Sequence, residues 1–248
     1  MNKSRVMTGD YGIDAPPAIR NLVISGVASI IAGIILHSIL ASTQLLIAII
    51  LSVCGLLAGA SMLVTAALLI WSSKIGKLQL REKLIDSLAL HGTETVLDVG
   101  CGRGLLLNAA ARRLITGKAI GIDLWQRADQ SGNHPESALA NAKVEGVAHL
   151  VEVETGDMRE LPFGDQTIDV VVSSLAIHNI LDKQGRAKAV QEIARVLNPG
   201  GQVALLDFQC TAEYAQTLHE LGWHEVKLSG LQFQMFPPVR VVTGKKPA

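Results

Sequence analysis

Two long, predominantly apolar segments stand near the start of the chain, at residues 22–40 and 45–71. Residues 21–73 contain no Asp, Glu, Lys or Arg, and the short polar stretch 41–44 separates the two segments. A helix needs roughly 20 apolar residues to cross a bilayer, and both segments reach that length. The pattern therefore predicts a transmembrane hairpin of two helices across residues 22–73.

Other interpretations of these segments fit less well. Buried helices of a soluble core rarely run this long without a charge. A cleaved signal peptide has a shorter apolar region, and a second span does not follow it at once. Basic residues flank the hairpin on both sides: Lys3, Arg5, Arg20, Lys74, Lys77, Arg81 and Lys83. By the positive-inside rule, both termini and the part after the hairpin are predicted to face the cytoplasm.

Small residues within the two apolar segments predict that the helices pack on each other. Ser25, Ser29 and Gly33 recur every four residues in the first, and Gly55 and Gly59 form a GxxxG in the second. Small side chains at this spacing allow two backbones to approach closely in lipid.

The segments on either side of the hairpin differ in character. Residues 1–21 are predicted to be a flexible polar leader, in which Pro16 and Pro17 stop any helix upstream. Residues 74–92 are predicted to be a linking segment with an amphipathic helix at 74–90. That helix either lies near the bilayer surface or simply covers the sheet that follows, and the sequence leaves both possibilities open.

From residue 93 onward, strand and helix patterns alternate, which predicts a doubly wound α/β sheet in residues 93–248. The predicted strands are 95–99, 118–123, 149–154, 168–173, 202–208, 224–228 and 239–243, and the predicted helices include 135–145, 186–197 and 212–221. The last two strands lie close together in sequence, which favours an antiparallel pair. No distinct substrate-capping insertion is visible between them.

The string Val-Leu-Asp-Val-Gly-Cys-Gly-Arg-Gly at 96–104 joins a predicted strand to a predicted helix through three glycines. Leu105 occupies the place where a dinucleotide-binding G-x-G-x-x-G motif has its third glycine, and no Lys-Ser or Lys-Thr follows as in a P-loop. Asp98 lies at the entry of the turn. A carboxylate there suits a ligand that carries an ammonium group better than it suits a phosphate.

This string resembles the first motif of class I S-adenosylmethionine (SAM) dependent methyltransferases, E/D-x-G-x-G-x-G, which Asp98, Gly100, Gly102 and Gly104 match in full. The resemblance implies a Rossmann-like, seven-stranded methyltransferase sheet with a terminal antiparallel strand. It also implies SAM as the cofactor, with Asp98 and the glycine turn, including Cys101, holding the methionine part.

Further residues extend the cofactor site. Asp123 ends the second strand about 20 residues beyond the turn, where a carboxylate can accept hydrogen bonds from a ribose diol. Leu124 follows it. The next residue, Trp125, either borders the adenosine or shields the sheet edge. By resemblance to the family's D-A/M-x-x-L-P-F segment, Asp157 and Met158 hold the adenine.

The block from Phe163 to Leu175 is similar to F-x-D-x-x-F-D-x-V-x-S of the small-molecule branch, which includes the ubiquinone and menaquinone methyltransferases (type 11). In that family this strand end, here Ser173, faces the reactive methyl group. It is not the Asn/Asp-Pro-Pro-Tyr/Phe of enzymes that methylate planar amino nitrogens. His178 follows one turn later and is the candidate general base, with capping or packing as the alternative role.

Composition and charge limit the ligands and partners that the chain is expected to bind. From residue 74 on there are 19 Lys and Arg against 20 Asp and Glu, so no basic footprint for nucleic acid is present. The three cysteines, Cys54, Cys101 and Cys210, are scattered, which indicates neither a disulfide framework nor a zinc site. No metal is expected.

The sequence thus predicts a membrane-anchored SAM-dependent methyltransferase that acts on a small, lipophilic acceptor such as a quinone precursor, an isoprenoid or a lipid. Three alternatives stay open: a SAM-binding module without catalysis, a methyltransferase of a soluble small molecule, and an oxidoreductase with an unusual glycine turn. The acceptor atom and the oligomeric state are not predicted.

Overall fold

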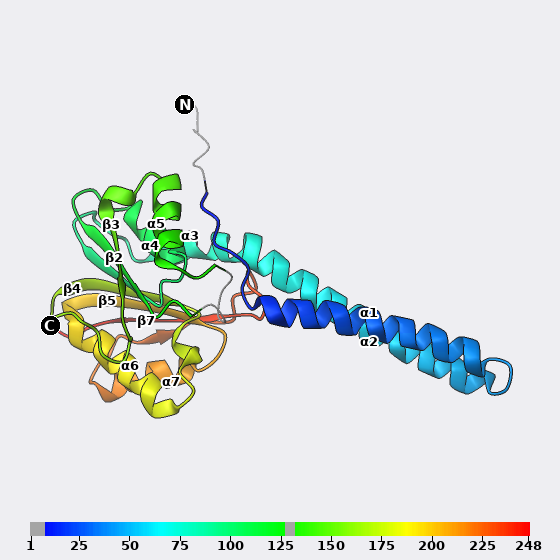
Figure 1. The fold of residues 1–248 in the computed structure, drawn as a ribbon. Coiled ribbons are helices and arrows are strands. Elements are labelled where there is room, and N and C mark those ends of the chain that lie inside the picture. Colours follow the sequence, from blue (N-terminus) through cyan, green and yellow to red (C-terminus); the bar gives the residue numbers. More distant parts are fainter. Residues whose placement is uncertain (1–7, 127–131) are drawn as a thin grey trace.

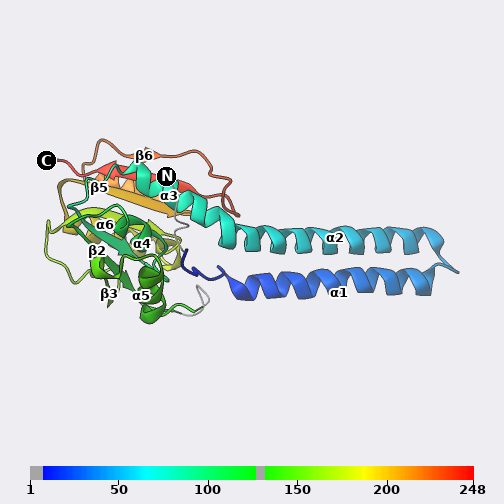
Figure 2. The ribbon, with the colours of Figure 1, turned by 90° about the horizontal axis from the view of Figure 1, so that it is seen from above.

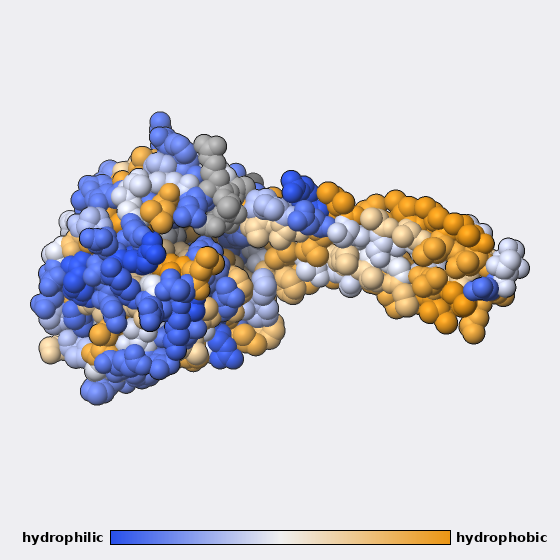
Figure 3. Space-filling model, turned by 60° about the horizontal axis from the view of Figure 1, so that its bottom comes forward, coloured by the Kyte–Doolittle hydropathy of each residue, from blue (hydrophilic) through white to orange (hydrophobic). Residues whose placement is uncertain are grey.

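The computed structural model describes residues 8–126 and 132–248. Two long helices form a hairpin that projects from an α/β part, and they lie side by side in both ribbon views (Figures 1 and 2). The hairpin consists of α1 (Pro16–Leu40) and α2 (Leu45–Trp71). Both helices are long and apolar enough to cross a membrane. Figure 3 shows the hairpin as the most hydrophobic surface of this face, whereas the α/β part is mostly hydrophilic.

The two hairpin helices pack through their small residues. Gly26 and Gly33 of α1 are buried, as is Gly59 of α2. The hydroxyl of Ser29 donates a hydrogen bond to the carbonyl oxygen of Gly55 at 3.2 Å. Large apolar side chains point outward instead, and Leu46 is 72% exposed. The expected helix pairing is present, and the outer surface of the hairpin is apolar.

The leader differs from the expectation of a flexible segment that extends to residue 21. Helix α1 begins at Pro16, six residues earlier than expected. Proline fits the first turn of a helix because the backbone N–H that it lacks has no hydrogen-bond partner within the helix at that position. Residues 8–15 pack on the α/β part, where Tyr11 is only 3% exposed. Lys3 and Arg5 lie outside the described residues.

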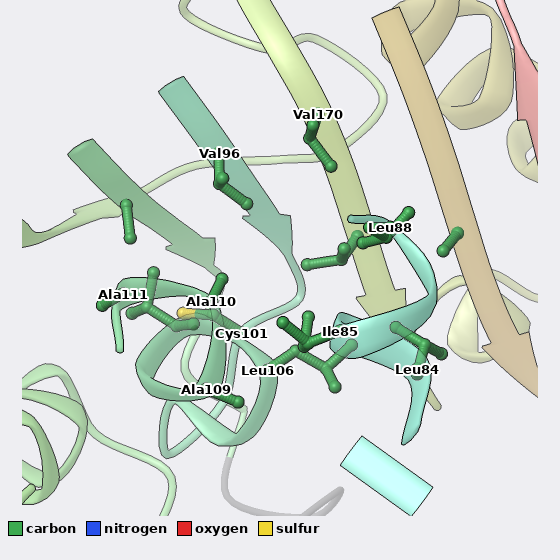
Figure 4. Close-up of a cluster of buried hydrophobic side chains, with 14 of the residues drawn as sticks. Leu84, Ile85, Leu88, Val96, Cys101, Leu106, Ala109, Ala110, Ala111 and Val170 are labelled. Carbon is green, nitrogen blue, oxygen red and sulfur yellow. The ribbon is translucent and has the colours of Figure 1, made fainter. Parts of the chain in front are cut away.

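The linking segment also departs from the expected single helix at 74–90. After α2 the chain forms a π-helical turn η1 (Ser72–Gly76) and then α3 (Lys77–Ser87). Leu84 and Ile85 of α3 are buried against the sheet. Of the two roles left open for this helix, the structure therefore shows the one in which it covers the sheet. Figure 4 shows Ile85 beside Leu106 of α4, with Leu88 between Ile85 and Val170 of β4, and all four belong to one buried cluster.

The sheet has seven strands in the order β3-β2-β1-β4-β5-β7-β6, and β7 is antiparallel to both neighbours. The strands are β1 (Thr95–Val99), β2 (Lys118–Asp123), β3 (Val151–Thr155), β4 (Ile168–Ser174), β5 (Leu197–Asp207), β6 (Lys227–Leu228) and β7 (Arg240–Lys245). This is the predicted fold class, with the terminal antiparallel strand in place. Strand β5 begins five residues earlier than predicted because Leu197 pairs with Ile168 ahead of a register shift.

Helices cover both faces of the sheet. Helices α3, α4 (Leu105–Ala111) and α5 (Pro135–Val144) lie on one face, and α6 (Lys183–Val196) and α7 (Thr211–Glu220) lie on the other (Figure 1). Each face has its own buried apolar cluster. The strands between them are buried on both sides, which explains why β1 and β4 read as continuous apolar runs.

The connection between β6 and β7, residues 229–239, reaches the base of the hairpin at η1. The amide of Phe236 donates to the hydroxyl of Ser72 at 2.9 Å. A methyl group on Gly76 would overlap the carbonyl oxygen of Gln234, so only glycine permits this approach. The C-terminal part of the sheet and the end of α2 are therefore packed together.

We predict that replacing both Gly55 and Gly59 with Leu separates the hairpin helices. A Cβ atom at these positions would lie 2.8 Å from the carbonyl oxygen of Ser29 and 2.6 Å from that of Gly26. The measurement is the rate of disulfide formation between cysteines introduced for His37 and Ser52, whose side chains approach to 3.5 Å. We expect a several-fold slower rate.

The cross-linking experiment uses a background in which Cys54 is Ser. Ala58→Leu serves as the matched control, because Ala58 lies on the same helix but is exposed. Equal cross-linking rates in the Gly55/Gly59 double variant and in the control would show that glycine packing does not hold the hairpin together.

Candidate functional site

A cavity of about 600 Å³ opens at the carboxyl ends of the parallel strands. The strand order reverses between β1 and β4, and ligands of open α/β sheets bind at such a switch point. The cavity is lined by the glycine turn, by the loops after β2, β3 and β4, and by residues near the base of the hairpin. Its volume lies in the usual range for small-molecule sites.

The glycine turn takes a backbone shape that other residues rarely adopt. Gly100, Gly102 and Gly104 all have positive φ angles, of 74°, 51° and 80°. A methyl group on Gly100 would also overlap the side chain of Ala176. Gly100, Cys101 and Gly102 line the cavity, whereas Gly104 caps the start of α4 outside it.

Asp98 lies at the floor of this turn and is 2% exposed. One carboxylate oxygen accepts a hydrogen bond from the amide of Leu107 at 2.8 Å. Burial, reinforced by the nearby carboxylate of Asp123, raises the pKa of Asp98 to about 7. An acid in this state is poised to pair with a cation that enters the cavity.

Asp123 is held at the end of β2 by a set of donors. It accepts hydrogen bonds from the amides of Gly102 at 2.8 Å and Trp125 at 2.6 Å, and from the side chain of Asn133 at 3.3 Å. Asp123 and its neighbour Leu124 both line the cavity. The Trp125 ring instead donates to the hydroxyl of Thr155 and packs on the sheet edge, outside the cavity lining.

Asp157 and Met158 both line the cavity after β3. The Arg159 guanidinium, which donates to both carboxylate oxygens, lowers the pKa of Asp157 below its ordinary value. Asp157 is therefore an ionised acceptor at neutral pH. Met158 is partly buried against the core on the α6 side of the sheet.

Ser173 is placed differently from the prediction. Its hydroxyl donates to the carbonyl oxygen of Val99 on β1 at 2.7 Å, within the sheet, and the next residue, Ser174, lines the cavity. Successive side chains of a strand point to opposite faces, so a shift of one residue decides which of them reaches the cavity.

His178 lines the cavity from a 3₁₀ turn, η3 (Ile177–Asn179). Its Nδ1 atom lies 2.8 Å from Oδ1 of Asp207, without the in-line geometry of a hydrogen bond. The Phe208 ring packs edge-on against the imidazole, with 4.6 Å between ring centroids. Asp207 also accepts a hydrogen bond from the hydroxyl of Tyr214 at 3.1 Å.

Several residues in or beside the cavity were absent from the sequence-based set; Asp207 contacts His178 without lining the cavity. Asp207 ends a buried strand at the carboxyl edge of the sheet, so the signal that identified Asp123 could also have identified it. No local signal points to Asp14, Ala15 and Met235, which reach the cavity from the two ends of the chain. Among residues 8–126 and 132–248 there is no cluster of His, Cys, Asp and Glu that could hold a metal ion.

Comparisons with known proteins find similarity to methyltransferases. Residues 97–205 match the family model described as a methyltransferase domain. A demethylmenaquinone methyltransferase of Lactobacillus johnsonii is 29% identical over 160 residues, which cover 63% of this chain and 57% of that protein. The ubiquinone/menaquinone biosynthesis C-methyltransferase UbiE of Roseobacter denitrificans is 33% identical over 128 residues, 52% of this chain and 48% of the relative.

A solved structure shares the fold. The structure of a putative methyltransferase from Bacillus halodurans superposes with a TM-score of 0.55 at 20% identity, covering 68% of this chain and 99% of that one. The chain spans about half the length of the curated relatives it matches.

We predict that Asp98→Asn stabilises the empty protein at alkaline pH. The pKa of Asp98 is raised on folding, so the folded state binds more protons than the unfolded state between about pH 4 and pH 7. The stability that Asp98 contributes therefore falls as pH rises through this window. Asn keeps the acceptor for the Leu107 amide without the buried charge.

Thermal unfolding of both proteins in detergent from pH 5 to pH 8 measures the effect. The advantage of Asp98→Asn should grow with pH and level off above about pH 7, at no more than about 4 kcal/mol. An advantage that stays constant over this range would mean that the Asp98 carboxylate is as well solvated in the fold as in the unfolded chain.

Proposed function

We propose that this chain, whose residues 97–205 match a methyltransferase-domain family model, transfers a methyl group from SAM to a small lipophilic acceptor while α1 and α2 anchor it in a membrane. One observation carries the proposal. A single cavity contains the acidic glycine turn, the two further acids and His178, and it also extends to residues at the base of the apolar hairpin.

The residues of the cavity fit SAM. The buried carboxylate of Asp98, with Gly100, Cys101 and Gly102 beside it, suits the ammonium group of the methionine part. Asp123, with Leu124 beside it, is placed to accept hydrogen bonds from the ribose hydroxyls. We assign the adenine to Asp157 and Met158. Gly104 shapes the turn without touching the cavity.

SAM supplies an electrophilic methyl group on a sulfonium, and the chain has to orient an acceptor atom in line with it and exclude water. Ser174, Leu175 and Ala176 line the cavity beside the glycine turn, on the loop that leads to His178. His178 is the group placed to take a proton from the acceptor, if that atom carries one. Asp207 lies on the far side of the imidazole and would stabilise the imidazolium that forms.

Apolar side chains form part of the cavity lining. They include Leu175, Ile180, Phe208 and Met235, together with Leu181, which is 95% exposed. These side chains would cover an apolar molecule better than a charged metabolite. The names of the two curated relatives refer to quinone precursors, which are lipophilic, and this supports the same class of acceptor.

The position of the cavity supports delivery from a membrane. Asp14 and Ala15 precede α1, and Lys77 follows the π-helical turn after α2, so the segments that enter and leave the hairpin both line the cavity. With residues 22–73 in a bilayer, the cavity would open close to its surface. The flanking basic residues favour a cytoplasmic location for the methyltransferase domain, residues 93–248.

Two alternatives remain in view. In the first, the same site methylates a soluble small molecule and the hairpin is only a tether. In the second, the chain binds SAM without transferring its methyl group. The paired His178 and Asp207 favour a catalytic site over a binding module, because a module has no need of a base in the cavity.

Methyl-labelled SAM tests the proposal. We expect that the full chain, solubilised in detergent and incubated with total membrane lipids, transfers label into the organic phase. The aqueous metabolite fraction should gain little. Label that enters aqueous products alone would contradict the lipophilic acceptor, and absence of transfer to either fraction despite SAM binding would support the non-catalytic module.

The same assay examines the base. His178→Ala should lower the transfer rate by about 10²-fold or more while the dissociation constant of SAM changes little. Asp207→Asn should have a smaller effect in the same direction, because it acts on the imidazole. Equal transfer rates for the wild type and His178→Ala would remove this residue from the chemistry.

A further inference from the structure

We propose that residues 8–15, here called the strap, are a positioning element of the cofactor site, which Tyr11 locks onto the glycine turn. The strap leads directly into α1, so it joins the hairpin to the place where SAM is held. This inference rests on the proposed function, because it takes the glycine turn as the binding site of the methionine part.

Tyr11 anchors the strap in a polar pocket formed by three helices. Its hydroxyl donates to Oε1 of Glu145 at 2.6 Å and accepts a hydrogen bond from the side chain of Asn108 at 3.3 Å. The guanidinium of Arg81 lies over its ring, 4.8 Å from the centroid. An unattached leader would leave such a side chain in water, whereas here the ring is 3% exposed.

The pocket that receives Tyr11 is built around a fully buried carboxylate. The side chain of Glu145 has no exposed surface and lies 3.1 Å from Arg81 and 2.9 Å from Arg112. The amide of Gly9 in the strap donates to the same carboxylate at 3.2 Å. A buried carboxylate needs hydrogen-bond or ion-pair partners, and the strap supplies two of them, the Gly9 amide and the Tyr11 hydroxyl. The docked strap therefore helps to satisfy the buried charge of Glu145.

The middle of the strap is bonded to the glycine turn itself. Arg103, which lies between the second and third glycines of the turn, donates from Nε to the carbonyl oxygen of Asp10 at 2.8 Å. The side chain of Asn141 donates to the carbonyl oxygens of both Asp10 and Arg103, at 2.9 Å and 3.0 Å. The turn and the strap thus share one hydrogen-bond network.

The last part of the strap forms a wall of the cavity. Asp14 and Ala15 line it beside Lys77, whose ammonium donates to the Asp14 carboxylate at 2.9 Å and to the carbonyl oxygen of Tyr11 at 2.8 Å. The amide of Asp14 donates to the hydroxyl of Ser73 in the π-helical turn. The strap is held at one end by the pocket around Glu145 and at the other by the hairpin.

It follows that SAM and the docked strap stabilise each other. Undocking removes a wall of the cavity and frees Arg103, so SAM should leave faster when the strap is loose. Bound SAM, in turn, should keep the strap in place, because binding couplings are reciprocal. Tyr11 is a positioning residue in this scheme, since it acts on the cofactor through the strap and the turn.

The experiment compares the wild type with Tyr11→Ala in the full, detergent-solubilised chain. Two quantities are measured: the dissociation rate of labelled SAM, and hydrogen exchange at the amides of Gly9 and Asp10, which donate to Glu145 and Asn141. We expect dissociation at least tenfold faster and exchange protection lost in Tyr11→Ala. In the wild type, SAM should increase the protection of both amides.

Tyr11→Phe provides a variant that keeps the ring and its packing, and it carries the test if Tyr11→Ala does not fold. It should give an intermediate, several-fold increase in the SAM dissociation rate. The matched control is Arg113→Ala, in the turn just after α4, because Arg113 pairs with Glu82 and Asp86 and does not contact the strap. The control should leave both readouts unchanged.

Loss of strap protection with an unchanged SAM dissociation rate would overturn the inference and reduce the strap to packing. A dissociation rate raised equally by Arg113→Ala would also overturn it, since the effect would then be general. Failure of the wild type to bind SAM at all would instead contradict the proposed function, so the two failures are distinguishable.

Discussion

The structure depends above all on a buried carboxylate near the end of β1, just before the glycine turn. Asp98 is 2% exposed, yet the parallel strands on both sides and the amide of Leu107 hold it in place. Its raised pKa, about 7, is the consequence of holding an acid where water cannot solvate it. In the function we propose, a ligand cation would relieve that cost. The positive φ angles of Gly100 and Gly102 keep the neighbouring turn free of side chains, so the acid and the glycines together would make a place for an ammonium group.

The hairpin is part of this arrangement rather than an appendage. The strap that precedes α1 is bonded to Arg103 of the turn, and the connection before β7 packs on Ser72 and Gly76 at the end of α2. The segments that enter and leave the hairpin are therefore both packed against the α/β part that holds the cavity. In the function we propose, an apolar acceptor that diffuses in a bilayer would meet the methyl donor at this junction without crossing water.

Much of the fold could be predicted from the sequence because its signals are local. Strands β1 and β2 lie at their predicted residues, since β-branched runs end there in glycine or in Asp123. The strap could not be predicted, because Tyr11 and its partner Glu145 are 134 residues apart. The same holds for Met235 in the cavity. The sequence also could not decide whether Ser173 or Ser174 reaches the cavity, because neighbouring side chains at the end of a strand point in opposite directions.

Equilibrium binding of SAM and of NAD to the full, solubilised chain shows which ligand the acidic glycine turn accepts. We expect calorimetry to find one SAM site per chain and no NAD binding. Asp123→Ala should weaken SAM binding at least tenfold, because it removes the acceptor of the ribose hydroxyls. Tighter binding of NAD than of SAM would instead make the site that of an oxidoreductase.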